Sequence, residues 1–142
     1  MPDRPNTEGP TPSPSPAKIL KYARIDWDNP LATSKAGTAP PRALVEEARR
    51  VGAKRKKLVR GEAGFYMNRS LLPPGYRVPP HHHNHDEMLI ILSGGCVFDD
   101  DFGEAGPDDT VVIPAKNHYG FVCGPEGMEF LTIRLGEATT EL

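Results

Sequence analysis

The spacing of hydrophobic residues changes along the chain, and it predicts two kinds of structure. Four apolar residues recur at helical spacing: Leu44, Val45, Ala48 and Val51. Pro41 suits the first turn of a helix, and Gly52 suits the position just after its end. The pattern therefore predicts one short helix over about residues 41–51.

From Gly64 onward the apolar stretches are shorter, and Gly, Pro and Asp residues separate them. They predict strands at 65–72, 87–92, 96–98, 110–113, 119–123 and 130–135. Turns are expected between these strands, including one at Ser93–Gly95 and one at Gly124–Gly127. Short strands at regular spacing are typical of a β-sandwich or small barrel, so the fold is predicted to be all-β.

The chain before this pattern has a different character. Residues 1–16 contain six prolines and few apolar residues, which predicts a disordered tail. Residues 17–60 are predicted to form an N-terminal arm that includes the helix. Trp27 marks an apolar stretch of this arm, which docks either on the barrel or on a second subunit. Residues 61–142 are predicted to form the barrel, and a length of 142 residues suits one domain.

Charge gives no indication of a nucleic-acid or membrane partner. The chain has 17 Lys and Arg against 19 Asp and Glu, so its formal net charge is −2. That balance predicts no general attraction to nucleic acid or to anionic membranes. The basic run Lys54–Lys57 is either an anion-binding patch or a solvated edge strand. The edge strand is favoured because no aromatic residues interleave with the charges.

The two cysteines, Cys96 and Cys123, are too few for a disulfide framework. Both stand in strand-like segments, so we expect free, buried thiols in a reducing compartment. The sequence shows no secretory leader and no apolar run of the ~20 residues that a membrane span needs. A soluble, cytoplasmic protein is therefore expected.

Four of the five histidines lie within five residues, followed by a glutamate: His81, His82, His83, His85 and Glu87. If this stretch is extended, alternation places the odd-numbered residues on one face. Two imidazoles and one carboxylate are the protein ligands of mononuclear iron(II) sites and of open zinc sites. The alternative is a surface histidine-rich loop that binds metal incidentally.

Residues 75–94 resemble the first motif of the cupin family, G-x5-H-x-H-x3-E-x6-G. Every fixed position matches: Gly75, His81, His83, Glu87 and Gly94. The resemblance implies a double-stranded β-helix, which is a cupin jelly-roll barrel. It also implies that His81, His83 and Glu87 hold one divalent metal ion inside the barrel. Fe²⁺ is favoured, and Zn²⁺, Mn²⁺ or Ni²⁺ are alternatives because first-row ions compete for such sites.

The second cupin motif, G-x5-P-x-G-x2-H-x3-N, is matched only in part. Its proline is Pro114, but Asp108 and Lys116 replace its two glycines. Tyr119 stands in the histidine position of the ungapped pattern, and His118 stands one residue earlier. A deletion in the turn would make His118 the fourth ligand, which we favour because imidazole binds metal well near neutral pH. Otherwise Tyr119 fills the position, as a weak ligand or a hydrogen-bonding group.

An inward Glu87 implies that Leu89 and Ile91 also point inward, because strand residues alternate. Two further pairs of residues point either into the barrel or away from it: Arg134 with Thr132, and Tyr66 with Asn68.

The resemblance implies a metal-dependent enzyme that acts on a small organic substrate, with Tyr119 as a catalytic proton donor. An iron(II) dioxygenase is one form of this chemistry. Lyases, isomerases and cyclases of the same architecture are alternatives, as are a cupin that binds a small ligand without turnover and a structural barrel. Cupins of this size often pair, so a homodimer is expected.

Overall fold

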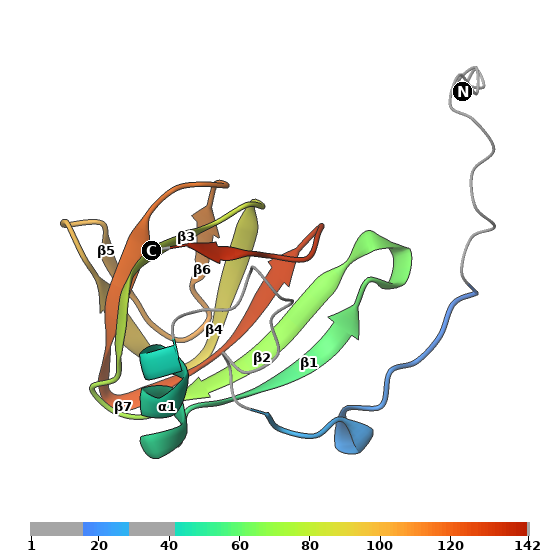
Figure 1. The fold of residues 1–142 in the computed structure, drawn as a ribbon, viewed down its shortest axis with the longest axis horizontal. Helices are drawn as coiled ribbons and strands as arrows, with labels where there is room; N and C mark the ends of the chain where they lie inside the picture. The colour runs from blue at the N-terminus through green and yellow to red at the C-terminus, as the bar shows by residue number, and fades with distance from the viewer. Residues whose placement is uncertain (1–15, 29–41, 142) are drawn as a thin grey trace, which may run out of the picture.

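The computed structural model describes residues 16–28 and 42–141, and Figure 1 shows its strands curled around a common interior. Its helical segments are short: η1 (Tyr22–Arg24), α1 (Arg42–Arg50) and η2 (Glu62–Gly64). The strands are β1 (Lys54–Arg60), β2 (Tyr66–Leu72), β3 (Arg77–His83), β4 (Glu87–Phe98), β5 (Gly103–Ala105), β6 (Thr110–Ile113), β7 (Tyr119–Arg134) and β8 (Thr140–Glu141).

The long strand β7 organises the sheet. It pairs with β2, β3 and β4, and all the pairings of the sheet are antiparallel. The order β1-β2-β7-β3-β8 runs along one path, and β4 adds β5 and β6 beside β7. The sheet closes on itself as a jelly-roll barrel, so the predicted all-β, double-stranded β-helix is confirmed.

Strands β4 and β7 are longer than the sequence predicts, because each bends where a turn was expected. Ser93–Gly95 and Gly124–Gly127 lie inside these strands as irregularities of pairing, so the prediction of chain-reversing turns there was wrong. Gly94 has φ +69°, and a Cβ on it would lie 2.1 Å from the carbonyl oxygen of Gly127. The two bends touch through backbone alone, which only glycine permits.

The interior next to the bends is apolar. Leu89 is 2% exposed and Ile91 is 0% exposed, so both point inward as predicted. Ile91 pairs with Phe130 across β4 and β7, and Phe130 pairs with Ser70 of β2. Directly opposed residues lie on the same face of a sheet, so these three residues show that the inner face continues from β4 across β7 to β2. Cys96 and Cys123 are buried and free, as expected.

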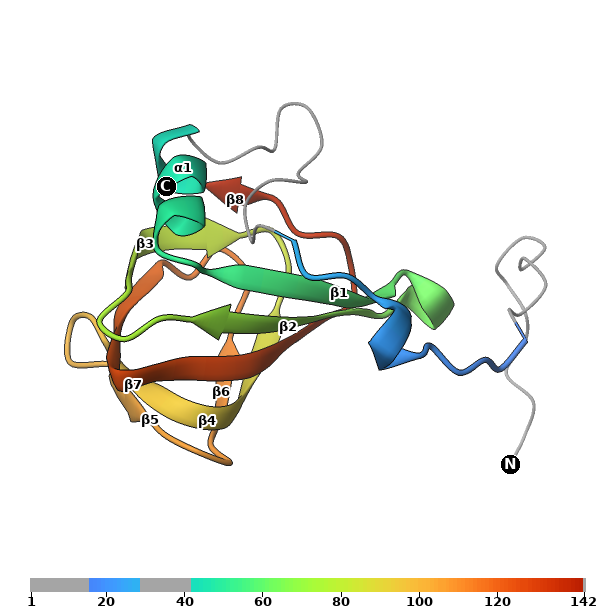
Figure 2. The ribbon, with the colours of Figure 1, turned by 90° about the horizontal axis from the view of Figure 1, so that it is seen from below.

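The later part of the arm, from η1 to Asp28, lies along β1, whereas the described residues before η1 extend past the end of this strand (Figure 2). The ammonium nitrogen of Lys56 lies 3.7 Å from the ring centroid of Tyr22 and 5.2 Å from that of Trp27. These cation–π contacts cover Lys56, which is only 7% exposed. The part of the arm around Trp27 therefore docks on its own barrel, whereas Ile19 is 79% exposed.

β1 belongs to the sheet, although the sequence placed it within the arm. It pairs with β2 along its length, so the sheet begins at Lys54 and not at residue 61. On its other side an isolated bridge joins Arg55 to Asp28 of the arm. The basic run is therefore an edge strand, as favoured from the sequence, but it is not a solvated one, because the arm covers Lys56.

The helix prediction is confirmed by α1. Val51 of its expected apolar face packs on the core, whereas the side chains of Leu44, Val45 and Ala48 lie outside the described part of the structure, as do residues 1–15 of the predicted tail. None of the described helices has the length and apolar character needed to cross a bilayer.

Candidate metal and catalytic site

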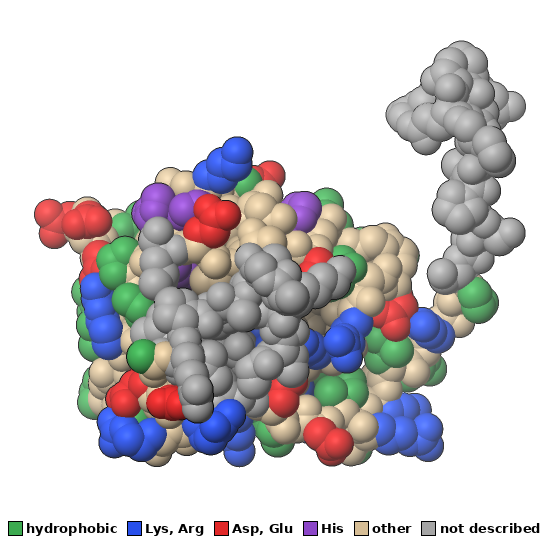
Figure 3. Space-filling view, viewed as in Figure 1, with side chains coloured by type: hydrophobic (Ala, Val, Ile, Leu, Met, Phe, Trp, Pro, Cys, Tyr) green, Lys and Arg blue, Asp and Glu red, His purple; other side chains and the backbone are tan. Residues whose placement is uncertain are grey.

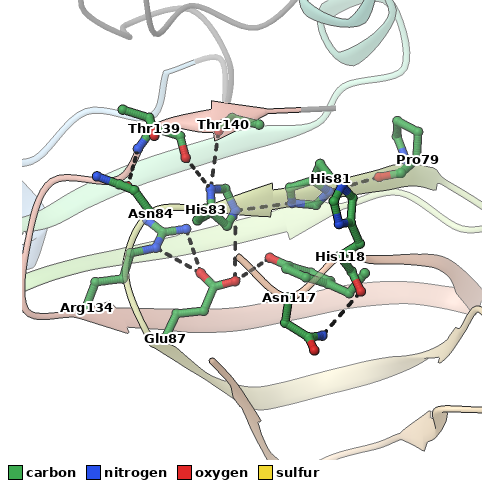
Figure 4. A network of polar contacts seen from close by, with 11 residues as sticks. Pro79, His81, His83, Asn84, Glu87, Asn117, His118, Arg134, Thr139 and Thr140 are labelled. Atoms are coloured by element: carbon green, nitrogen blue, oxygen red, sulfur yellow. Dashed lines mark hydrogen bonds and ion pairs between the residues drawn. The ribbon is translucent and has the colours of Figure 1, made fainter. Parts of the chain in front are cut away.

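Two strands from opposite parts of the barrel bring the predicted metal ligands together. His81 and His83 share one face of β3, and both are buried. β3 ends at His83, and Glu87 is the first residue of β4. If this stretch were extended throughout, all three residues would lie on one strand. Instead the chain turns at residues 84–86, and Glu87 faces the imidazoles from another strand (Figure 4).

The imidazole rings of His81 and His83 face each other through their Nε2 atoms. The Nε2 atoms of His81 and His83 lie 3.2 Å apart. The Nδ1 atom of His81 lies 2.9 Å from the carbonyl oxygen of Pro79, and that of His83 lies 2.9 Å from the carbonyl oxygen of Thr139. A carbonyl only accepts, so each Nδ1 carries the proton and donates it. In the neutral imidazoles both Nε2 atoms therefore present lone pairs to the same point.

Burial favours these neutral forms. Desolvation lowers the pKa of His83 to about 4, against a smaller opposing effect of the Glu87 carboxylate. Desolvation also lowers the pKa of His81, opposed by its hydrogen bond to Pro79. Both rings are therefore uncharged near neutral pH, which is the state that binds metal.

Glu87 is 3% exposed and is held on both carboxylate oxygens. Arg134 donates to Oε2 from Nε at 2.8 Å, and its Nη2 lies 2.7 Å from the same oxygen. Tyr119 donates from its hydroxyl to Oε1 at 2.5 Å. Oε1 also lies 3.9 Å from Nε2 of His83. One oxygen is thus fixed by a guanidinium while the other faces the imidazoles.

Tyr119 is the residue of the second motif that reaches this site. Its Cα pairs with that of His81 across β7 and β3, and the two ring centroids lie 4.5 Å apart. Desolvation raises the pKa of the Tyr119 hydroxyl well above its ordinary value, and the Glu87 carboxylate raises it further. The hydroxyl therefore keeps its proton and donates it to Glu87.

His118, which the sequence favours as fourth ligand, lies elsewhere. Its side chain is exposed, and its Nε2 lies 2.9 Å from Nδ1 of His82. His82 Nε2 in turn lies 2.8 Å from Oε2 of Glu141. His82 alternates with His81 and His83 along β3, so its side chain points away from the interior. His118 contacts His82 and therefore lies on this outer side as well. Figure 3 shows histidine side chains on the outer surface above the barrel.

Residues of β2, β7 and the segment before β8 complete the surroundings of the site. Arg134 and Thr132 both point inward, which settles the alternative left by the sequence. Tyr66 pairs with Arg134 in the register of β2 and β7, so the Tyr66 and Asn68 face is the inner one. Thr139, whose carbonyl holds His83, escaped the sequence reasoning because it lies 56 residues away along the chain.

The donor set fits a divalent ion in part. Among the residues that the structure describes, no group of three or more His, Cys, Asp or Glu side chains is arranged to hold a metal ion as it stands. The imidazole pair suits a shared ion, because nitrogens about 2.1 Å from one ion at tetrahedral or octahedral angles lie about 3.0–3.4 Å apart. Oε1 of Glu87 is the nearest further donor, at 3.9 Å from His83 Nε2.

Comparison with known proteins identifies relatives by family and by fold. The cupin domain family matches residues 68–134. No curated protein sequence matches the chain. Among solved structures, the polyketide cyclase RemF from Streptomyces resistomycificus is 28% identical, with a TM-score of 0.53 over 63% of this chain and 69% of that one.

Two other solved structures share the fold at lower identity. KdgF from a Halomonas species is 16% identical, with a TM-score of 0.60 over 84% of this chain and 96% of that one. An RmlC-like cupin protein from Ralstonia eutropha is 15% identical, with a TM-score of 0.62 over 88% of this chain and 72% of that one. At these identities the likeness shows the fold alone.

Proposed function

Because the chain belongs to the cupin superfamily, we propose that its barrel holds one divalent metal ion and acts as an enzyme on a small organic substrate. His81, His83 and Glu87 are the proposed protein ligands. Tyr119 is the proposed proton-transferring residue, and Arg134 fixes the glutamate.

The observation that carries this proposal is the facing pair of imidazole lone pairs. Two neutral imidazoles with Nε2 atoms 3.2 Å apart repel each other unless a cation or a proton lies between them. Burial disfavours a proton on either ring. A metal ion is therefore the favoured cation, and when bound it would polarise a carbonyl or enolate oxygen of the substrate.

The chain's own residues supply a proton path beside that position. Tyr119 holds a proton on its hydroxyl, directed at Oε1 of Glu87. Arg134 holds the Glu87 carboxylate in place, because its positively charged guanidinium lies against Oε2. A substrate C–H or O–H group that reached the Tyr119 oxygen could pass its proton there while the Tyr119 proton moves to Oε1 of Glu87. The reverse transfer would return the proton to the substrate, which is general acid–base catalysis with no net gain or loss of protons.

Among the possible reactions, proton-transfer chemistry has the most support. Of the solved structures described above, RemF is the one with identity high enough to bear on chemistry, and its name describes a polyketide cyclase. Cyclisation, elimination and isomerisation of carbonyl compounds proceed through proton transfer beside a polarised carbonyl, a role for which the Tyr119 hydroxyl is suited. An iron(II) dioxygenase remains the alternative, since the same ligands hold iron.

The first experiment is the metal content of protein purified anaerobically without chelator, compared with His83→Ala and with His118→Ala as matched control. We expect about one equivalent in the wild type and in His118→Ala, and near zero in His83→Ala, because the open sites of this kind rest on three protein ligands. Full occupancy in His83→Ala would refute the site.

The second experiment separates the reaction classes. A β-diketone probe is incubated with the loaded protein while its absorbance and the dissolved oxygen are both recorded. Conversion without oxygen uptake supports the cyclase, lyase or isomerase proposal. Conversion with stoichiometric uptake supports the dioxygenase. Binding without conversion, for this probe and for aromatic polyketide analogues, would favour a cupin that only binds its ligand.

A further inference from the structure

The short strand β8 pairs with the end of β3 that carries the proposed metal ligand His83. It has only two residues, Thr140 and Glu141, and they pair with His83 and His82 of β3. No other strand in the described part of the chain pairs with β8. Figure 4 shows this strand passing directly over the His83 ring. So short a strand adds little to the sheet, but it lies against a proposed metal ligand.

The two imidazoles differ in what holds them. His81 donates from Nδ1 to Pro79, a residue of its own strand two positions earlier. His83 donates from Nδ1 to the carbonyl of Thr139, and the hydroxyl oxygen of Thr140 lies 3.4 Å from the same nitrogen. The orientation of His83 therefore depends on a segment that is distant in sequence and must be held in place.

Asn84 is the side chain that holds this segment. Its Oδ1 accepts a hydrogen bond of 2.7 Å from the backbone amide of Thr139. Thr139 therefore makes two hydrogen bonds through its backbone. Its amide donates to Oδ1 of Asn84, and its carbonyl oxygen accepts from Nδ1 of His83. Asn84 is exposed and touches no proposed ligand through this bond, so its contribution to His83 is indirect.

We propose that Asn84 and the segment Thr139–Glu141 form a strap that positions His83, fixing the tautomer that leaves its Nε2 free for metal. Asn84 is thus a positioning residue. The inference rests on the proposed function for the metal, but the tautomer itself does not need one. Partners that orient a ligating histidine are worth about 10- to 100-fold in metal affinity in other proteins.

The test combines tautomer and affinity in four proteins: wild type, Asn84→Ala, Asn84→Asp and Asn117→Ala. Asn84→Asp keeps an acceptor oxygen for the Thr139 amide. Asn117→Ala removes a similarly exposed asparagine that bonds only within its own loop, to the carbonyl of His118. Nitrogen-15 NMR of the metal-free proteins reports the His83 tautomer, and Zn²⁺ titration against a chelating dye reports affinity.

We expect His83 to be protonated at Nδ1 in the wild type, in Asn84→Asp and in Asn117→Ala. Asn84→Ala should show a mixture of tautomers and bind Zn²⁺ about tenfold more weakly. An unchanged tautomer and unchanged affinity in Asn84→Ala would overturn the strap.

The two proposals fail in different ways. If Asn84→Ala changes the tautomer but no variant binds any metal, the strap stands and the metal site falls. If the wild type binds one equivalent of Zn²⁺ and Asn84→Ala matches it in both measurements, the metal site stands and the strap falls. Hydrogen exchange of the Thr139 amide serves as a control. Faster exchange of this amide in Asn84→Ala, with the exchange of the barrel amides unchanged, would show that the substitution released the segment without unfolding the barrel.

Discussion

The hydroxyl of Tyr119 donates a hydrogen bond of 2.5 Å to Oε1 of Glu87, although the two residues are 32 positions apart. This contact joins the first motif to the second. It also places Tyr119, and not the neighbouring His118, beside the proposed metal ligands. His118 precedes β7 and is exposed, whereas Tyr119 is the first residue of β7 and is buried, so only Tyr119 reaches the interior.

The contrast predicts an order of effects on metal binding. Tyr119→Phe removes the proton donor to Glu87 and should weaken metal binding by about tenfold, the lower end of the range for partners of a ligand. His118→Ala should leave the affinity within about twofold, because its ring contacts only the outward His82. Titration of both variants with Zn²⁺ checks the order, and the reverse order would return His118 to the site.

Arg134 is predicted to be needed for folding as well as for the site. Arg134→Met leaves the carboxylate of Glu87, 1% exposed at its side chain, without its cation. Removing one partner of a buried ion pair costs about 3–5 kcal/mol. The matched control is Arg77→Met, whose pair with Asp99 is at the surface, where solvent screens the charges, so its loss should be much smaller. Urea unfolding of both variants measures the difference, and equal losses would contradict the prediction.

Acid should destabilise the metal-free protein through His83. The pKa of this residue is about 4 in the folded chain, against 6.5 as its ordinary value, chiefly because of desolvation. Between these values the unfolded chain binds a proton that the folded chain excludes, so stability is full above pH 6.5 and is lost as the pH falls toward 4.

The matching measurement is urea unfolding at about pH 7.5 and about pH 4.5, for the wild type and His83→Gln. We expect the wild type to lose roughly 2 kcal/mol more than the variant over this interval, from the linkage of a single site. Equal losses in the two proteins would show that His83 is not the group responsible.

The bend in β4 should not tolerate a side chain. Gly94→Ala combines a backbone at φ +69° with a Cβ placed 2.1 Å from the Gly127 oxygen, so we expect a loss of roughly 3 kcal/mol. Gly52→Ala is the control, because Gly52 also has positive φ but nothing within 4 Å of its Cβ position. Its loss should be only about 1 kcal/mol, and thermal or urea unfolding compares the two.

The two cysteines should be inert in the folded protein. Desolvation raises the pKa of Cys96 to about 11 and that of Cys123 to about 12, so little thiolate is present near neutral pH. A chromogenic thiol reagent should therefore label neither residue in native buffer and both in denaturant. Rapid labelling of the native protein would contradict the burial of the thiols.

Much of the fold was predictable from local patterns. Alternation and turn residues predicted β2, β6 and parts of β4 and β7, and helical spacing predicted α1, because these features depend on neighbouring residues alone. The short strands β5 and β8 were not predicted, and turns between strands were expected at Ser93–Gly95 and Gly124–Gly127. Whether such a stretch reverses a strand or bends it depends on the partner strand, and Gly94 is packed on Gly127 from 33 positions away in the sequence.

The resemblance to cupins, the all-β barrel and the residue types of the proposed site could be read from the sequence, because the spacing of His81, His83 and Glu87 lies in one short stretch. Three features needed the folded chain: Glu87 faces the imidazoles from another strand, Tyr119 lies beside Glu87 where His118 was favoured, and Arg134 points inward. It alone showed Thr139 on His83. The physical reason is that strand register and closure of the barrel set which distant side chains share a face, and no local pattern contains that information.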